Sequence, residues 1–295
     1  MLTLERLAQL AASHPAALQS RVDGFHLHGK DFNFSAKPAI MGVINLSPDS
    51  WYRESVCLNT TRAAERARVL SAQGADIIDI GAESTLAHAA RVGEQAQGDL
   101  LTPLVQQLKS ENLLVSVETY SPEVTRRTLE AGAAVINLTG TAGTEEIFQA
   151  AADHEAAVII CYVQGANVRE VSDYDLARDP IGACYEYFAR AVDQARRVGV
   201  TRIFVDPGLG FYYRNLGDSA TRVKHQMHVF LNSFRLRPLG CPICHALPHA
   251  FEFFGEEVRT AEAFFAVLAS LGSTNLFRTH EVPKVRAVLE TLQQA

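Results

Sequence analysis

From residue 37 onward, the chain alternates short apolar runs with longer stretches in which apolar residues recur every three or four positions. Short runs of this kind are typical of β-strands, and the three-to-four spacing is typical of amphipathic helices. The predicted strands are Ala39–Asn45, Ile77–Gly81, Leu114–Glu118, Ala134–Leu138, Ala157–Tyr162, Arg202–Asp206, Pro242–Ala246 and Thr274–Arg278. The predicted helices cover about residues 60–73, 95–110, 122–131, 144–154, 179–198, 219–236, 258–271 and 283–294. Eight strand–helix pairs in one unbroken alternation indicate strands that all run parallel.

Two further features of the pattern select a closed barrel. Glycines stand between a helix and the next strand, as at Gly132 and Gly199, where a helix C-cap glycine belongs. The alternative, an open doubly wound sheet, needs a glycine-rich phosphate loop after its first strand, and Asn45-Leu-Ser-Pro-Asp-Ser50 is not one. We therefore predict an α/β fold made of a single (β/α)₈ TIM barrel.

The first 36 residues follow a different pattern. Leu2–Arg21 carries an Ala/Leu stripe and predicts one amphipathic helix. The alternation in Phe25–Phe34 around Gly29-Lys30 predicts a β-hairpin. We expect residues 1–36 to form an N-terminal extension that packs on a barrel comprising residues 37–295.

Composition narrows the class of protein. The chain has 295 residues with a formal net charge of -6, so general attraction to nucleic acid or to anionic lipid is not expected. No apolar run reaches the roughly 18–20 residues of a membrane helix, and the N-terminus does not resemble a secretion signal. The five cysteines fit reduced thiols better than a disulfide framework. These features predict a cytoplasmic protein.

Polar residues follow the apolar runs at six of the eight strands, where a barrel enzyme carries its active site. Such residues also begin loops for purely conformational reasons, but their recurrence at matching places favours a site. The residues concerned include Asn45, Asp79, Glu83, Glu118, Asn137, Asp206, Arg278 and His280.

The types of these residues suggest a ligand. Asp206, Asn137 and Glu118 offer acceptors and one amide, a mixed set that suits the edge of a flat nitrogen heterocycle. Arg278 and His280, two positions apart, supply donors for phosphate. Asn45 adds a neutral ligand, and Mg²⁺ is a natural companion of a diphosphate. The residues thus predict a site for a heterocycle with an attached phosphate or diphosphate.

The strand-end motifs resemble those of the dihydropteroate synthase family, in order and at similar spacing, from about residue 37 to 285. They are Met41-Gly-Val-Ile-Asn-Leu-Ser-Pro-Asp-Ser50, Gly74-Ala-Asp-Ile-Ile-Asp-Ile-Gly-Ala-Glu-Ser-Thr85, Ser116-Val-Glu-Thr-Tyr120, Val135-Ile-Asn137, Asp206-Pro-Gly-Leu-Gly-Phe211 and Arg278-Thr-His280. The resemblance implies a (β/α)₈ enzyme, usually a homodimer, that joins a dihydropterin-CH₂-diphosphate to p-aminobenzoate and releases diphosphate.

The resemblance also implies roles for individual residues. Asn137 and Asp206 would hold the pterin ring, with Glu118 in place of the family's aspartate. Asn45, Arg278 and His280 would hold the diphosphate with Mg²⁺. Thr85 and the segment 47–51 would shape the aminobenzoate side, and Phe211 would line the same cleft.

Three departures from the family pattern affect the expected site. Glu118 is one methylene longer than the family's aspartate, and Leu86 replaces the arginine that follows the Glu-Ser-Thr motif. The Ser-Arg-Lys that follows the seventh strand is missing, and Cys244-His-Ala-Leu-Pro-His249 stands there instead. The lysine would contact the pterin and the serine the aminobenzoate, and His249 is the residue expected to substitute in part.

Around the seventh strand, Cys241-Pro-Ile-Cys244-His245 matches the c-type haem attachment pattern, but it falls on a predicted buried strand. Cys241, Cys244, His245 and His249 offer the ligands of a zinc site, although neighbouring residues on a strand point to opposite faces. We favour buried thiols with one or two histidines at the cleft.

Three functions remain open at this point. The first is a transferase of the dihydropteroate synthase type, with p-aminobenzoate or a related aromatic amine as acceptor. The second is a binding or regulatory relative that holds a pterin without condensation. The third is a methyl-transfer protein that binds a reduced pterin or folate in the same barrel.

Overall fold

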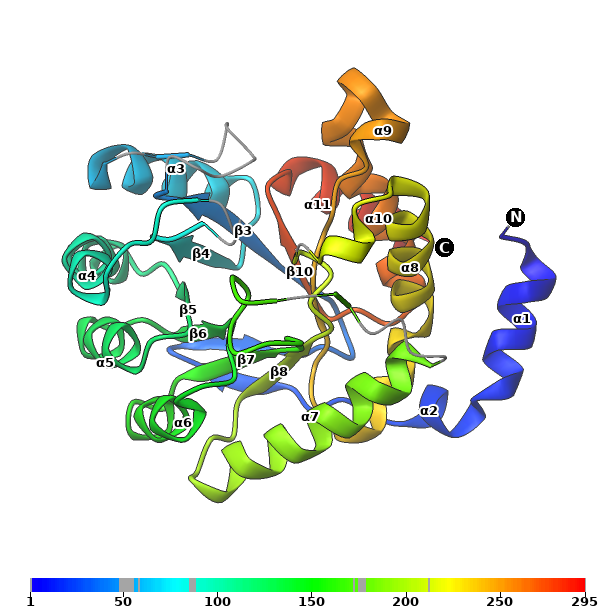
Figure 1. Ribbon diagram of the computed structural model, residues 1–295, viewed down its shortest axis with the longest axis horizontal. Helices are drawn as coiled ribbons and strands as arrows, with labels where there is room; N and C mark the ends of the chain where they lie inside the picture. Colours follow the sequence, from blue (N-terminus) through cyan, green and yellow to red (C-terminus); the bar gives the residue numbers. More distant parts are fainter. Residues whose placement is uncertain are drawn as a thin grey trace.

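The computed structural model describes residues 2–47, 56–57, 59–84, 89–171, 173–174, 179–211 and 213–294. Its main body is one eight-stranded parallel sheet surrounded by helices (Figure 1). The strands are β3 (Ala39–Asn45), β4 (Ile77–Gly81), β5 (Val115–Thr119), β6 (Val135–Leu138), β7 (Ala157–Cys161), β8 (Ile203–Asp206), β9 (Cys244–Ala246) and β10 (Leu276–Thr279). The helices that follow strands are α3 (Thr60–Ala72), α4 (Glu94–Ser110), α5 (Pro122–Ala131), α6 (Thr144–Asp153), α7 (Pro180–Arg197), α8 (Ser219–Asn232), α9 (Phe251–Phe254), α10 (Ala261–Leu271) and α11 (Val282–Leu292).

The sheet runs in the order β8-β7-β6-β5-β4-β3-β10-β9, so each strand lies beside its neighbour in sequence and β3 also pairs with β10. Between β8 and β9 a single parallel bridge, Val205 with Ile243, brings the two ends together. The result is a nearly closed barrel, which confirms the predicted TIM-barrel fold. All eight predicted strands are present, with ends within two residues of those expected.

The parallel register places the carboxyl ends of the strands at one rim. Glu118 of β5 stands opposite Asn137 of β6, and Cys161 of β7 stands opposite Asp206 of β8. Apolar residues of the strands are buried on both faces, as the uninterrupted burial of Ala157–Cys161 illustrates. The sheet is therefore a rigid support for polar side chains at its carboxyl rim.

The N-terminal region differs from prediction in two details. The single predicted helix is two helices, α1 (Leu4–Ser13) and α2 (Pro15–Gln19), because Pro15 lacks an amide hydrogen and forces the preceding residue out of helical geometry. His14 accordingly has φ -138° and ψ 53°. The hairpin of β1 (Phe25–Leu27) and β2 (Lys30–Phe32) turns at His28-Gly29, one residue earlier than expected, and both turn residues have positive φ.

The hairpin contributes to the core of the barrel. Phe25, Phe34 and Phe204 of β8 form a mutual ring cluster, with centroid distances of 5.2–5.6 Å. Phe204 is fully buried at the start of its strand, so the hairpin rings cover the amino end of the barrel. The opposite rim is where the polar strand ends lie.

Two of the later helices also differ from prediction. The helix expected over 219–236 is α8 followed by a 3₁₀ helix, η3 (Ser233–Leu239), which contains Pro238. The helix expected over 258–271 is a 3₁₀ segment, η4 (Gly255–Thr260), followed by α10, with the short α9 before it. Within the described residues, no helix is both long and apolar enough to cross a membrane.

The Phe204 cluster provides a test of the fold. Phe204→Ala should lower the free energy of unfolding by roughly 3–5 kcal/mol, because a fully buried ring is removed from a packed core. Phe253→Ala is the control, since that ring is 61% exposed and its loss should change stability by less than about 1 kcal/mol. Urea denaturation of both variants makes the comparison. Equal losses would show that the hairpin cluster does not support the barrel.

Candidate active site

A cleft opens at the carboxyl rim of the barrel and encloses about 1120 Å³ outside the protein atoms, part of it open to solvent. Eight of the nine site residues expected from the sequence line it: Asn45, Glu118, Asn137, Asp206, Phe211, His249, Arg278 and His280. The ninth, Thr85, lies outside the described residues, as does residue 86. The structure therefore brings these residues together from six different strands or the loops after them.

At the floor of the cleft, one guanidinium joins two carboxylates. Arg278 of β10 donates from Nε to Oδ2 of Asp79 at 2.7 Å and from Nη2 to Oε2 of Glu118. The exposed fractions of these side chains are 16% for Arg278, 1% for Asp79 and 12% for Glu118. The charges are thus shielded from water and offset one another.

Asp79 is a residue to which the sequence reading gave no role. Its Oδ1 accepts from the Ser116 hydroxyl at 2.6 Å, and its Oδ2 accepts from the Asn137 amide at 3.3 Å. A carboxylate in the middle of an apolar strand needs such partners, so the position of Asp79 in the sequence was the signal that could have identified it. Through these bonds Asp79 fixes the orientation of both Asn137 and Arg278.

Asp206 occupies the end of β8 and is almost fully buried. Its Oδ1 accepts from the Gly208 amide at 2.7 Å. Gly208 has φ +76°, and a Cβ there would stand 2.4 Å from the Tyr162 carbonyl oxygen, so this loop requires glycine. The turn after β8 therefore holds the carboxylate firmly in the cleft wall.

Burial changes the proton affinity of both cleft acids. It raises the pKa of Asp206 to about 6, against the lowering effects of the Gly208 amide and Arg278. Burial likewise raises the pKa of Glu118; Arg278 opposes this, and Asp79 and Asp206 add to it. Near neutral pH each of these carboxyl groups can therefore bind a ligand in two ways. It can accept hydrogen bonds as an anion or donate one as a protonated acid.

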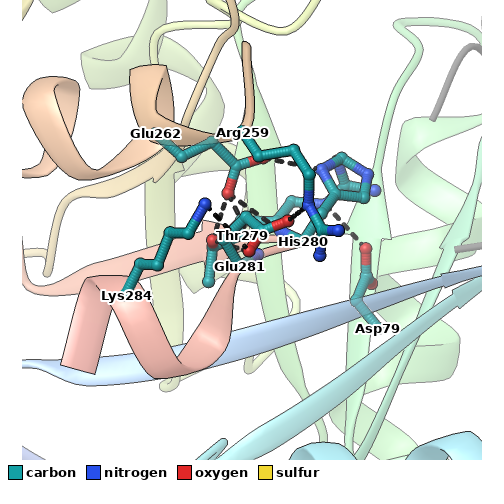
Figure 2. Close-up of polar contacts among 8 residues, drawn as sticks. Asp79, Arg259, Glu262, Thr279, His280, Glu281 and Lys284 are labelled. Atoms are coloured by element: carbon teal, nitrogen blue, oxygen red, sulfur yellow. Dashed lines mark hydrogen bonds and ion pairs between the residues drawn. The ribbon is translucent and has the colours of Figure 1, made fainter. Parts of the chain in front are cut away.

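The rim of the cleft carries His280 and Arg222. The Nδ1 atom of His280 lies 2.9 Å from Oε1 of Glu262 on α10 (Figure 2). Arg222 of α8, which the sequence reading did not single out, is 16% exposed and pairs with Glu252 at 3.1 Å. Arg222 belongs to a helix rather than a strand end, so a search restricted to strand ends could not find it.

Loops on the other side of the cleft are joined by a buried ion pair. Arg169 Nη1 lies 2.9 Å from Glu83 Oε1, with side-chain exposures of 2% and 7%. Glu83 also accepts from the Tyr120 hydroxyl at 2.5 Å and from the Val92 amide at 3.0 Å. Glu83 thereby ties together the loops that follow β4, β5 and β7.

The seventh strand separates its four candidate ligands. Cys241 and Cys244 are buried, in line with the favoured interpretation. His245 is fully buried with Nε2 2.7 Å from the Ser233 hydroxyl, outside the cleft, whereas His249 lines the cleft. In the described part of the chain, no three His, Cys, Asp or Glu side chains gather in a metal-binding arrangement. The zinc interpretation has no support among these residues.

His249 has limited capacity to replace a lysine. Burial, with a smaller contribution from the neighbouring Arg222, lowers its pKa to about 3. The imidazole is therefore neutral at pH 7. It can donate or accept a hydrogen bond, but it brings no positive charge to the cleft.

Residues 41–249 match the family model described as pterin binding enzyme. The dihydropteroate synthase of Synechocystis sp. is 33% identical over 186 residues, which cover 61% of this chain and 63% of that protein. The probable bifunctional folylpolyglutamate synthase/dihydropteroate synthase of Haloferax volcanii is 31% identical over 266 residues, which cover 86% of this chain and 30% of that protein. The chain thus aligns with less than two thirds of the length of either relative.

A solved structure gives a similar result for the fold. The Xanthomonas albilineans dihydropteroate synthase with 4-aminobenzoic acid superimposes with a TM-score of 0.76 at 25% identity. The superposition covers 92% of this chain and 97% of the other.

The raised pKa of Asp206 predicts a pH-dependent cost to stability. The folded protein holds this proton more tightly than the unfolded chain, so the stabilisation is present below about pH 4 and is lost as the pH rises through about 6. Asp206→Asn keeps the shape without the charge. The variant should gain up to roughly 3 kcal/mol relative to the parent between pH 4 and pH 7.

Urea denaturation at several pH values measures this difference, because other titrating groups cancel between parent and variant. A stability difference between parent and variant that stays constant from pH 4 to pH 7 would show that burial does not raise the pKa of Asp206.

Proposed function

Because this chain belongs to the family of pterin-binding enzymes, we propose that its cleft binds a dihydropterin-CH₂-diphosphate and transfers the pterin to an aromatic amine. The family match confirms the resemblance first drawn from the strand-end motifs. The proposed reaction is that of dihydropteroate synthase, with p-aminobenzoate or a related amine as acceptor and diphosphate as the product released. It would place the protein in folate or pterin metabolism.

The observation that carries the proposal is the convergence of Asp206, Asn137 and Glu118 on one buried floor. A pterin edge presents N–H donors beside a carbonyl acceptor, so it needs both acceptors and donors from the protein. Asn137 supplies an amide, and the two carboxyl groups accept as anions or donate when protonated. Because all three stand on strand ends, the set is held rigid before a ligand enters.

The phosphate end of the ligand would lie toward Arg278 and His280 on the strand β10 side of the cleft. A guanidinium binds phosphate through paired hydrogen bonds, and Arg278 is already oriented by Asp79 and Glu118. Asn45 would hold Mg²⁺ together with the substrate's own phosphate oxygens, which suits an ion that takes few protein ligands. When bound, the ion supplies positive charge for the departing diphosphate.

The chemistry that fits these residues is dissociative. The C–O bond to the diphosphate breaks, the pterin stabilises the resulting cation, and the amine nitrogen attacks it and loses a proton. No covalent nucleophile is required, and burial raises the pKa of Cys161 and of Cys244 well above the ordinary value, so neither is a ready thiolate. Positioning and charge stabilisation would supply the acceleration, with Phe211 and Thr85 on the acceptor side.

A second candidate function is pterin binding without condensation. The lysine expected after the seventh strand is absent, and His249 is neutral. Arg222 brings a cation to the same wall of the cleft, although it pairs with Glu252. Loss of one preorganised electrostatic contact commonly costs on the order of 10²–10³ in rate, so binding can persist where turnover is poor.

Pairing of two chains into a homodimer is also part of the proposal, and analytical ultracentrifugation measures it.

Phosphate recognition can be separated from ring recognition with two variants. Arg278→Lys keeps a charge for Asp79 but loses the forked guanidinium, so it should weaken a pterin diphosphate about tenfold or more and hardly affect the hydroxymethyl pterin. Asp206→Asn should weaken both ligands to a similar degree, because both carry the ring. Isothermal calorimetry with the two ligands provides the four affinities. Equal losses of the two ligands in Arg278→Lys would show that Arg278 does not bind the phosphate.

Condensation itself is tested by measuring product beside binding. The protein should bind pterin diphosphate and form product with p-aminobenzoate slowly, and Arg222→Gln should lower that rate by at least about tenfold if Arg222 supplies the missing positive charge. Arg126→Gln, an exposed arginine outside the cleft, is the matched control. Tight binding with no product would favour the binding role or another acceptor. No pterin binding would refute the proposed function.

A further inference from the structure

Glu262 is a buried acid on the helix layer behind the cleft. It lies in the first turn of α10 between alanines, and it is 2% exposed. Figure 2 shows its carboxylate directed at the segment Thr279–Glu281, where strand β10 ends. A buried carboxylate is costly unless it is hydrogen-bonded and paired, so its contacts indicate its role.

The two oxygens of Glu262 have different partners. Oε2 accepts from the Thr279 hydroxyl and from the amides of His280 and Glu281, the last two at 3.0 and 3.2 Å. Oε1 faces Nδ1 of His280 at 2.9 Å. Three donors at Oε2 fix the rotation of the carboxylate, and Oε1 is thereby aimed at the imidazole.

The neighbouring charges leave this pairing to His280. Arg259 and Lys284 both lie beside the cluster, but both pair with Glu281, Lys284 at 3.6 Å (Figure 2). His280 pairs with Glu262 through Nδ1. A carboxylate oxygen can only accept, so the bond to Nδ1 requires a proton on that nitrogen.

We propose that Glu262 is a positioning residue that binds the His280 ring through Nδ1–H and so directs Nε2 toward the phosphate end of a ligand, to which Nε2 donates when it also carries a proton. His280 lines the cleft and its side chain is 9% exposed, so the imidazole borders the space that a ligand would fill. The same arrangement of carboxylate behind imidazole fixes the tautomer and orientation of histidines in other sites. The ligand class is a phosphate or diphosphate ester, and the inference rests on the proposed function.

The replacement Glu262→Gln should reverse the histidine tautomer. Three donors at Oε2 would select the carbonyl oxygen of the glutamine for that position, and the NH₂ group would then occupy the place of Oε1. An NH₂ group facing Nδ1 is a donor, so Nδ1 would have to accept and the proton would move to Nε2. The ring would keep its place, but a proton on Nδ1 would face an NH₂ donor instead of an acceptor. Only the singly protonated ring would then meet the phosphate, and a charge-assisted hydrogen bond would be replaced by a neutral one.

The experiment compares the parent, Glu262→Gln and Glu281→Gln, where Glu281 is the neighbouring buried acid bound to Arg259 and Lys284. Nitrogen-15 NMR at alkaline pH measures the tautomer of His280, assigned by its loss in His280→Asn. Calorimetry measures the affinity for inorganic pyrophosphate, for pterin diphosphate and for the hydroxymethyl pterin. Glu262→Gln should move the proton to Nε2 and weaken both phosphate ligands about tenfold or more, and Glu281→Gln should retain the parent values within about threefold.

Every other result contradicts a specific part of the proposal. A parent His280 protonated on Nε2 alone, or an unchanged tautomer in folded Glu262→Gln, overturns the positioning role without reference to any ligand. A reversed tautomer with unchanged pyrophosphate affinity overturns the link to phosphate. Failure of the parent to bind pterin diphosphate overturns the proposed function instead, and the tautomer measurement still decides the role of Glu262.

Discussion

The guanidinium of Arg278, held between Asp79 and Glu118, is the interaction on which the rest of the cleft depends. It joins strands β4, β5 and β10 across the carboxyl end of the barrel, and Asp79 passes the constraint on to Asn137. Buried ion pairs of this kind add little net stability compared with apolar packing, but removing one partner commonly costs about 3–5 kcal/mol. The ion pairs therefore serve to position hydrogen-bonding groups, and the apolar packing of the barrel core offsets their energetic cost.

Two basic side chains at the carboxyl end of strand β10 are each paired with buried acids. Arg278 is backed by carboxylates inside the barrel, and His280, two residues later, is backed by Glu262 from the helix layer. In each case an acid behind the basic group, Asp79 for Arg278 and Glu262 for His280, holds it in place. A cleft built in this way can offer positive charge to a phosphate while its own charges stay compensated in the absence of the ligand.

The opposite side of the cleft depends on Glu83 and Arg169, an ion pair that joins loops rather than strands. The cationic residues of the family pattern that are missing here would stand in loops, after the second and seventh strands. Here Arg222 of α8 brings a cation to the cleft from the helix layer. Loops at the carboxyl rim of a barrel can change without disturbing the sheet that carries the strand-end residues.

The sequence by itself determined the eight strand–helix pairs and the residues at the strand ends, because apolar periodicity and parallel connectivity are local properties that place all those ends at one rim. The break between α1 and α2 at Pro15 is also a local effect that the sequence determines, although the Ala/Leu stripe across it predicted one helix. Only the tertiary structure decided which charges meet. Asp79 and Glu118 lie 199 and 160 positions from Arg278, and the neutral state of His249 follows from burial that no local pattern encodes. Pairing and proton affinity depend on distances between side chains from separate elements and on their exclusion from water, and both exist only once the barrel has closed.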